Sequence, residues 1–182
     1  MSAIPQQNMT VEEFERYASK HGRCELINGE VFSMSPTGDE HGTITGMLHG
    51  YLWHHVNTHK LGRVYAAETG FKGRDSQTVR APDIAFTAQA RLPKKRSTSF
   101  SDVIPDLIVE TTSPNDRSGE VASKVRWWLA QGAQLVWIIE PQPQTVTAYH
   151  PNGSARVFAN QDLLVGGDVV PHFTLPVSAI FE

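Results

Sequence analysis

One segment constrains the fold most, because it is almost entirely apolar over the full length of a strand. Residues 134–141 read QLVWIIEP. A strand that is apolar on both faces is typical of a sheet covered on both sides. With 182 residues, the chain is long enough to bury such a sheet within one domain.

The rest of the pattern supplies partners for this strand. Helical spacing and caps predict helices at about 11–20, 41–59 and 118–131. Asn-Gly pairs predict hairpins at Asn28-Gly29 and Asn152-Gly153. Further strands are predicted at 64–71, 79–87 and 106–112. This order predicts the α/β class, as a mixed β-sheet flanked by helices with an N-terminal helix and hairpin and a C-terminal hairpin. We expect residues 1–9 to be a disordered lead and residues 10–182 to form a single domain.

Composition excludes several classes of protein. The net charge of −3 gives no sign of a strongly basic nucleic-acid-binding surface, although it leaves a local basic patch open. The single cysteine, Cys24, cannot form an internal disulfide, which suits a reducing compartment. No run approaches the roughly 18 apolar residues of a spanning helix. We therefore expect a soluble cytoplasmic protein with no membrane partner.

Two carboxylates lie within apolar strand segments, where an unpaired charge is costly. Asp83 lies in VRAPDIAF, and Glu110 ends DLIVE. Each alone is more simply explained as a solvated or salt-bridged strand end. Together, on strands about 4.8 Å apart, they could share one cation. Since Mg²⁺ is usually held by one or two carboxylates and a substrate phosphate, the pair predicts a Mg²⁺ or Mn²⁺ site for phosphodiester cleavage.

Pro82-Asp83, a spacer and Glu110-Thr111-Thr112 together resemble the PD-(D/E)XK nuclease motif, with Thr112 where the motif carries lysine. A wider set of segments resembles the Uma-type family of putative restriction endonucleases, long catalogued as a domain of unknown function and abundant in cyanobacteria. The resemblance covers about residues 9–181. Its segments read CELINGEVFSMSP with EHG next, RAPDIAF, PDLIVETTSPNDR, a helix carrying Lys124, QGAQLVWIIEPQPQTVTAY and LPVSAIF. The resemblance implies a restriction-endonuclease-like fold.

The resemblance also implies roles for four residues. Asp83 and Glu110 are the metal ligands, and Glu25 of CELING assists them as a third. Lys124, on the helix after the Glu110 strand, replaces the missing lysine. Lys124 lies one turn from Trp128 at the edge of the apolar stripe of its helix, so its ammonium could reach the end of the sheet. The alternative is an ordinary surface lysine whose stem covers apolar groups.

Three further features have two readings each, and a fourth, Trp127, has one. Glu30 is either a weaker site candidate or a solvated hairpin acid. His41 either faces the site or is a polar group at a helix end. Residues 91–96, RLPKKR, either touch phosphates or form a solvated loop. Trp127 lies off the apolar stripe of its helix, which suggests a partner surface and a homodimer.

The sequence thus predicts a divalent-metal-dependent endonuclease that hydrolyses DNA phosphodiester bonds. The alternative is a catalytically inactive relative acting as a nucleic-acid-binding or protein-interaction module. Thr112 and the mildly acidic net charge favour this alternative. A hydrolase of another phosphoester would share the same site, and the sequence does not separate it from a DNA endonuclease.

Overall fold

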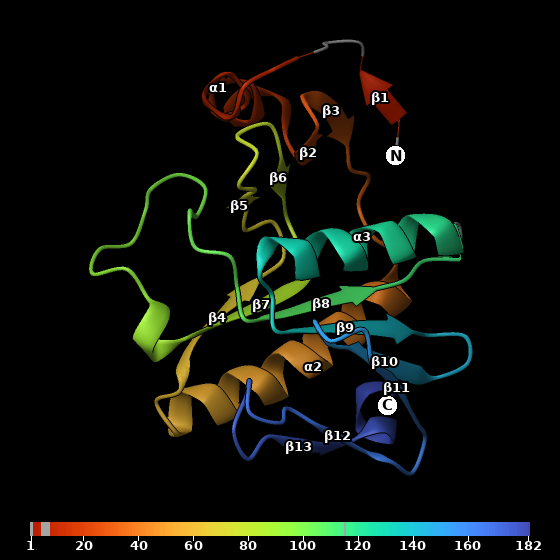
Figure 1. The fold of residues 1–182 in the computed structure, drawn as a ribbon. Coiled ribbons are helices and arrows are strands. Elements are labelled where there is room, and N and C mark those ends of the chain that lie inside the picture. Colours follow the sequence, from red (N-terminus) through yellow and green to blue (C-terminus); the bar gives the residue numbers. More distant parts are fainter. Residues whose placement is uncertain (1, 5–7, 115) are drawn as a thin grey trace.

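The computed structural model describes residues 2–4, 8–114 and 116–182. Its larger sheet has six strands in the order β11-β10-β9-β8-β7-β4 (Figure 1). Their bounds are β4 Gly62–Ala66, β7 Ile84–Ala88, β8 Leu107–Thr111, β9 Leu135–Glu140, β10 Thr145–Tyr149 and β11 Ala155–Ala159. The strands β8 and β9 pair in parallel and the other neighbours pair antiparallel, so the sheet is mixed as predicted.

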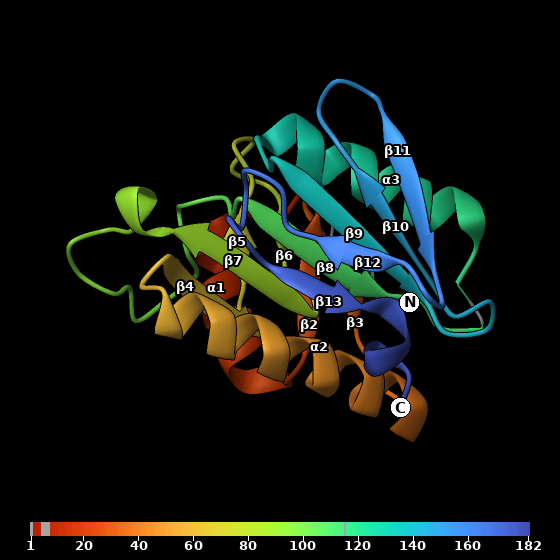
Figure 2. The same cartoon turned by 90° about the horizontal axis from the view of Figure 1, so that it is seen from below.

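Each face of this sheet is covered by a different layer (Figures 1 and 2). Helix α3 (Ser118–Gln131) covers one face. The other face carries α2 (Asp39–Thr58), the strand pair β12 (Leu163–Val165) and β13 (Thr174–Pro176), and the short helix η2 (Val177–Ile180). On β9, Val136 packs toward α3 and Trp137 toward α2, and both are fully buried. The apolar segment at 134–141 is therefore the central, doubly covered strand that its composition predicts.

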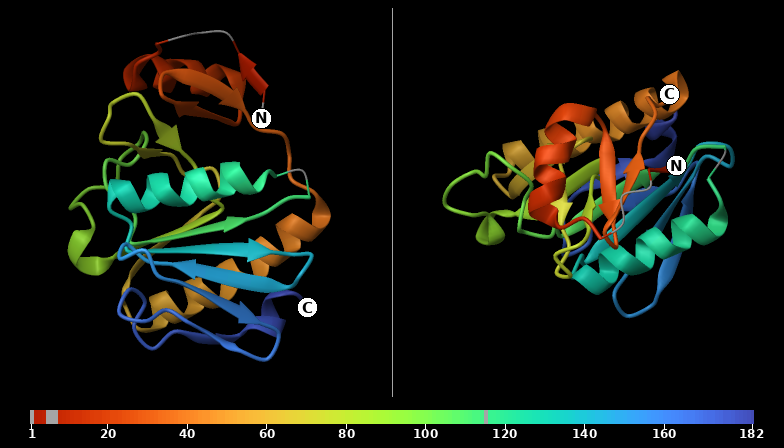
Figure 3. Two further views of the ribbon diagram at one scale, coloured as in Figure 1. Left: turned by 45° about the vertical axis from the view of Figure 1, so that its right-hand side comes forward. Right: turned by 90° about the horizontal axis from the view of Figure 1, so that it is seen from above.

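A second, five-stranded sheet lies beyond α3 with the N-terminal helix α1 (Val11–His21), in the order β1-β3-β2-β6-β5 (Figures 1 and 3). Its strands are β1 Ser2–Ile4, β2 Cys24–Ile27, β3 Glu30–Ser33, β5 Phe71–Lys72 and β6 Val79–Arg80. Thr10 and Glu13 form a capping box at the start of α1, as their spacing predicts. Phe14, Leu26 and Val31 form the core of this unit.

The second sheet corrects the predicted strands at 64–71 and 79–87. The first divides into β4 and β5, and the second into β6 and β7. Pro82 lies between β6 and β7 and has no N–H for a ladder, so it ends one strand before the next begins. The chain therefore passes from the small sheet to the large sheet at Pro82-Asp83, and this crossing point is where the candidate site forms.

Two further expectations concern the chain as a whole. Residues 2–4 form β1 and pair with β3, whereas the sequence predicts a disordered lead over 1–9; residues 1 and 5–7 lie outside the described part. None of the helices in the described ranges combines the length and the apolar character needed to cross a bilayer. A short helix, η1 (Gln89–Arg91), follows β7 and opens the loop at 92–103.

Candidate active site

Asp83 and Glu110 are brought together by the pairing of β7 and β8. The two strands run antiparallel, with Ile84 opposite Val109. One further step in this register places Asp83 across from Glu110, and opposed side chains of antiparallel strands share a face about 5 Å apart. The backbone N–H of Thr111 donates to Asp83 Oδ2 over 2.8 Å, which fixes Asp83 beside the end of β8.

Glu110 is held by two side chains of α3. Lys124 Nζ donates to Glu110 Oε2 over 2.8 Å, and Trp128 Nε1 donates to Oε1 over 3.1 Å. Lys124 and Trp128 are one helical turn apart, so their side chains leave the same face of the helix. The side chain of Glu110 is 9% exposed and that of Lys124 is 20% exposed. The helix thus supplies a partner for each oxygen of a nearly buried carboxylate.

Burial and neighbouring charges shift the pKa of both members of this ion pair. Burial raises the pKa of Glu110 to about 7; Lys124 opposes the rise, whereas Asp83 and Glu25 add to it. Burial by itself lowers the pKa of Lys124, but the negative charge of Glu110, followed by those of Glu25 and Asp83, outweighs burial and raises that pKa. Lys124 therefore remains an ammonium group at neutral pH, surrounded by carboxylates.

Asp83 has a second partner in His41, which lies in the first turn of α2. His41 Nε2 is 3.2 Å from Asp83 Oδ2 and 3.0 Å from the carbonyl oxygen of Thr111. Because both neighbours are acceptors, the proton of His41 belongs on Nε2. The hydrogen bond to Asp83 raises the pKa of His41 against the opposing effect of burial. Thr45, one turn further along α2, bonds the Thr111 hydroxyl over 2.9 Å and fixes the helix to β8.

Glu25 comes from the small sheet and is fully buried. Its Oε1 accepts from the backbone N–H of Ala81 over 2.8 Å. Its Oε2 lies 3.7 Å from the guanidinium of Arg80, too far for a hydrogen bond, and has no hydrogen-bond partner. The charge of Glu25 raises the pKa of both Glu110 and Lys124, which places this carboxylate within electrostatic reach of the pair.

Two hollows flank this group of charges. One of about 240 Å³ lies between the β2–β3 hairpin and α3, with Phe32, Arg80 and Lys124 in its lining. The other, of about 360 Å³, is lined by His41, Asp83 and Glu68. The site is therefore reached from two sides, through Lys124 and through Asp83.

The donor chemistry suits a hard divalent cation, which prefers carboxylate oxygens. Three carboxylates influence one another, one of their buried oxygens has no hydrogen-bond partner, and Glu110 is difficult to ionise. A cation would give the unpaired oxygen a partner and would favour the ionised form of Glu110. Across residues 2–4, 8–114 and 116–182, however, no group of three or more His, Cys, Asp or Glu side chains is arranged to hold a metal ion. The fit therefore rests on Asp83 and Glu110, with Glu25 further removed.

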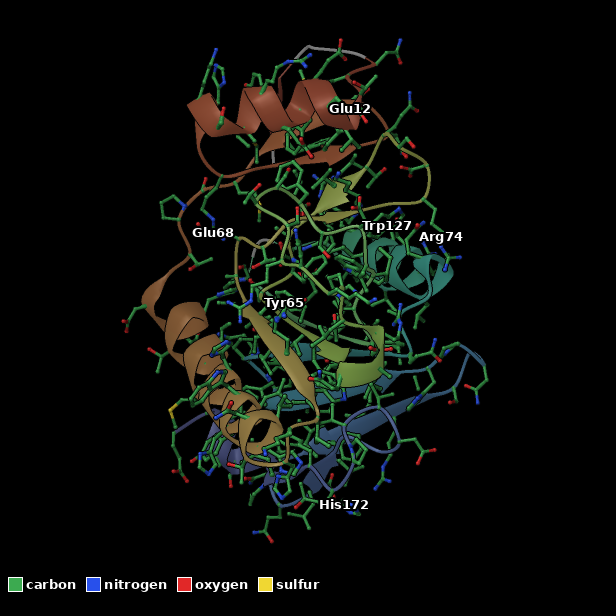
Figure 4. The ribbon with its side chains drawn as sticks, turned by 90° about the vertical axis from the view of Figure 1, so that its left-hand side faces the viewer. Glu12, Tyr65, Glu68, Arg74, Trp127 and His172 are labelled. Carbon is green, nitrogen blue, oxygen red and sulfur yellow. The ribbon has the colours of Figure 1, made fainter. Side chains whose placement is uncertain are left out.

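Of the four residues predicted from the sequence, Asp83, Glu110 and Lys124 thus meet at the end of β8, whereas Glu25 acts on them only through its charge. Thr112 does not take the place of the missing lysine, because its hydroxyl donates to the carbonyl oxygen of Ile139 in β9 over 3.2 Å. Glu30 is exposed on the hairpin. Trp127 is partly buried, stacking edge-on against Trp128 with the Arg80 guanidinium 5.1 Å from its ring. It is therefore not the exposed aromatic group that its position off the apolar stripe predicts (Figure 4).

Sequence reasoning missed two contributors, Arg80 and Trp128, and left the role of His41 open between two readings. His41 lies 70 residues before Thr111 in the chain, and nothing local links the two. Arg80 resembles an ordinary strand residue until β2 and β6 pair. Trp128 lies on the apolar stripe of its helix, which predicts a core residue, but its spacing of four residues from Lys124 is the signal that both reach Glu110.

Comparison with known proteins agrees with the fold. The Uma2 model, described as "Putative restriction endonuclease", matches residues 11–178. The crystal structure of a putative nuclease belonging to DUF820 from Anabaena variabilis ATCC 29413 is similar, with a TM-score of 0.84, 21% identity, and coverage of 95% of this chain and 97% of that chain. At this identity the likeness shows the fold alone. A search of the curated proteins gave no match. Since the family model spans most of the chain, the protein belongs to the Uma2 family of putative restriction endonucleases.

Proposed function

We propose that this protein is a divalent-metal-dependent endonuclease that hydrolyses phosphodiester bonds in DNA. The observation that carries the proposal is the meeting of Asp83, Glu110 and Lys124 at the end of β8. These residues provide two acidic oxygen donors and an ammonium group within one partly buried site. The family and the fold suggest a nuclease, and the restriction-endonuclease-like class usually uses divalent metals.

In this proposal Asp83 and Glu110 hold Mg²⁺ or Mn²⁺, and Glu25 assists them. When bound, the cation supplies Lewis-acid charge that polarises the scissile phosphate. Lys124 is protonated at neutral pH because its pKa is raised. This favours a role in orienting the attacking water and stabilising negative charge on the phosphate, and it disfavours proton abstraction by Lys124.

His41 acts on the chemistry through Asp83 and is therefore a positioning residue. Its Nε2–H bridges Asp83 and the carbonyl oxygen of Thr111. The backbone N–H of Thr111 holds the same carboxylate oxygen. Two donors thus fix the orientation of Asp83 before any cation or substrate arrives, and such preorganisation reduces the cost of binding.

Plasmid nicking in the presence of Mg²⁺ or Mn²⁺ tests the proposal. We expect the wild-type protein to nick supercoiled DNA and Asp83→Asn to lose the activity, because the substitution removes a charged ligand with little change in shape. Asp168→Asn is the matched control, since Asp168 is exposed in the loop between β12 and β13. Equal nicking by all three proteins, purified in parallel, would show that the activity does not come from this site.

A catalytically inactive relative, acting as a nucleic-acid-binding or protein-interaction module, is the second candidate. It is favoured by the lack of a ready three-ligand group among the described residues and by Thr112 in place of lysine. Calorimetry with Mn²⁺ separates the two candidates. The nuclease predicts a binding event that disappears in Glu110→Ala, whereas the module predicts no heat at millimolar metal.

We further propose a homodimer and a cytoplasmic location. Exposed apolar side chains on β11 and β12, namely Val157, Leu163 and Val165, support the dimer. Light scattering of the wild type and Val157→Asp tests it, and the variant should be monomeric. The single cysteine, Cys24, supports a reducing compartment. Cell fractionation of the tagged protein tests the location.

A further inference from the structure

A large hollow lies away from the carboxylates, along the open edge of β4. It encloses about 900 Å³ between α2, β4 and the loop at 92–103. Strand β4 is the last strand of the large sheet, so its outer edge pairs with no other strand of the described residues. Side chains with charge or aromatic character in the lining are Trp53, Arg63, Tyr65, Lys95, Arg96 and Asp102.

The charge of this groove is opposite to that of the whole chain. Its lining contains three basic side chains and one acidic side chain, while the protein carries a net charge of −3. The acid, Asp102, already pairs with Lys72 over 3.2 Å. Within the described residues, Arg63, Lys95 and Arg96 form no ion pair, so their charges are available to an anionic ligand.

Aromatic groups accompany these cations. Trp53 on α2 is 50% exposed, an unusual state for a residue of this size. Tyr65 packs edge-on against Phe71, and the guanidinium of Arg63 lies 5.8 Å from the Tyr65 ring. A groove that is lined by both cations and aromatic rings is typical of surfaces that follow a nucleic-acid backbone and its bases.

The groove leads to the candidate active site. Its lining includes Tyr65 and Thr69, whereas the residues between them, 66–68, line the hollow that contains Asp83. Ala66, the last residue of β4, pairs with Ile84, the residue directly after Asp83. Figure 4 shows β4 facing the viewer, with Tyr65 near one end of the strand and Glu68 beyond it. A chain lying along β4 therefore arrives at Asp83.

We propose that the groove defined by Arg63, Lys95, Arg96 and Trp53 binds the phosphodiester backbone of DNA and directs it to the carboxylates at the end of β8. This inference rests on the proposed function, because it assigns the surface along which the DNA substrate reaches the carboxylates. The loop at 92–103 supplies two of the three cations and forms one wall of the groove. Backbone contacts of this kind position the substrate and carry no sequence preference.

Fluorescence anisotropy with a labelled duplex in EDTA tests the groove without cleavage. The variant Arg63→Gln/Lys95→Gln/Arg96→Gln should bind at least about tenfold more weakly at about 0.1 M salt. At this salt concentration, the counterions released by each phosphate contact raise the affinity by up to about eightfold, and the variant loses this gain. Its plot of log affinity against log salt should be shallower by about 2 to 3. The matched control is Lys20→Gln/Arg126→Gln/Arg156→Gln, with the same charge change at exposed positions on α1, α3 and β11.

The outcomes separate the groove from the nuclease proposal. Loss of affinity and of salt slope in the groove variant, with wild-type behaviour in the control, supports the groove even if no protein nicks DNA. Equal weakening in both variants, or none in either, overturns it and leaves the active site untouched. A wild-type dimer that dissociates in the groove variant also overturns it, because a second copy then occupies the β4 edge. Circular dichroism and thermal melting check that the groove variant folds.

Discussion

Lys124→Met isolates the ion pair on which the candidate site depends. The substitution deletes the ammonium group and keeps a long apolar side chain at this position of α3. Lys124 Nζ lies 2.8 Å from Glu110 Oε2, and the two side chains are 20% and 9% exposed. Breaking a buried pair costs about 3–5 kcal/mol, and partial exposure of Lys124 screens part of this, so we expect a loss of about 2–3 kcal/mol in unfolding free energy at pH 8.

This loss depends on pH because Glu110 titrates near neutrality. Burial raises the pKa of Glu110 to about 7 in the folded protein, above its ordinary value. The stability contributed by this group is therefore fully present below the ordinary pKa and is lost as the pH rises through 7. At pH 5 the Glu110 carboxyl is largely protonated and gains little from the Lys124 ammonium group, whereas at pH 8 it is ionised and gains much more. Lys124→Met should accordingly lower the free energy of unfolding much less at pH 5 than at pH 8.

Urea unfolding in EDTA between pH 5 and pH 8 measures the effect. The wild type, Lys124→Met, Glu110→Gln and the double variant form a cycle whose coupling free energy should be about 2 kcal/mol at pH 8 and should shrink toward pH 5. Lys20→Met, at an exposed position on α1, should change stability by less than about 0.5 kcal/mol. An equal loss at both pH values, or no coupling at pH 8, would refute the buried ion pair and the raised pKa of Glu110.

Three further predictions follow from the contacts of the site. His41→Ala should slow nicking and destabilise the protein by about 1–2 kcal/mol, since Asp83 loses a charge-assisted hydrogen bond; His54→Ala, exposed on the same helix, should do neither in the same nicking and melting assays. Trp128→Phe should cost about 1–3 kcal/mol in urea unfolding by leaving a buried oxygen of Glu110 without its donor, and should cost more than Trp127→Phe. Mn²⁺ at about 100 times its dissociation constant should stabilise the wild type by about 2.7 kcal/mol in thermal melts, EDTA should reverse this, and Asp83→Ala should show no gain.

The sequence predicts those parts of the fold whose signals are local. The apolar segment ending at Glu140 becomes the central strand, and the helix before Gly132 ends where its left-handed cap predicts. The Asn28-Gly29 turn forms its hairpin between β2 and β3. Each of these depends on a handful of neighbouring residues. The resemblance then supplies the nuclease fold, which the TM-score of 0.84 bears out.

The remaining features depend on contacts between distant segments. The division of the predicted strands at 64–71 and 79–87 leaves two-residue strands, β5 and β6, that are too short to leave a pattern. The burial of Glu25 follows from the pairing of β2 with β6, where Leu26 lies opposite Val79. The groove along β4 forms because the loop at 92–103 folds over a sheet edge, and a basic loop sequence does not indicate which surface it will cover.

A crystal structure soaked with Mn²⁺, analysed by the anomalous signal of the metal, tests the central claim most directly. We predict one peak shared by a carboxylate oxygen of Asp83 and one of Glu110, with Lys124 beside it. The same soak of Glu110→Ala should lose the peak. A peak elsewhere, or no peak at saturating Mn²⁺ while Lys124 remains bonded to Glu110, would contradict the claim that these carboxylates form a metal-dependent nuclease site.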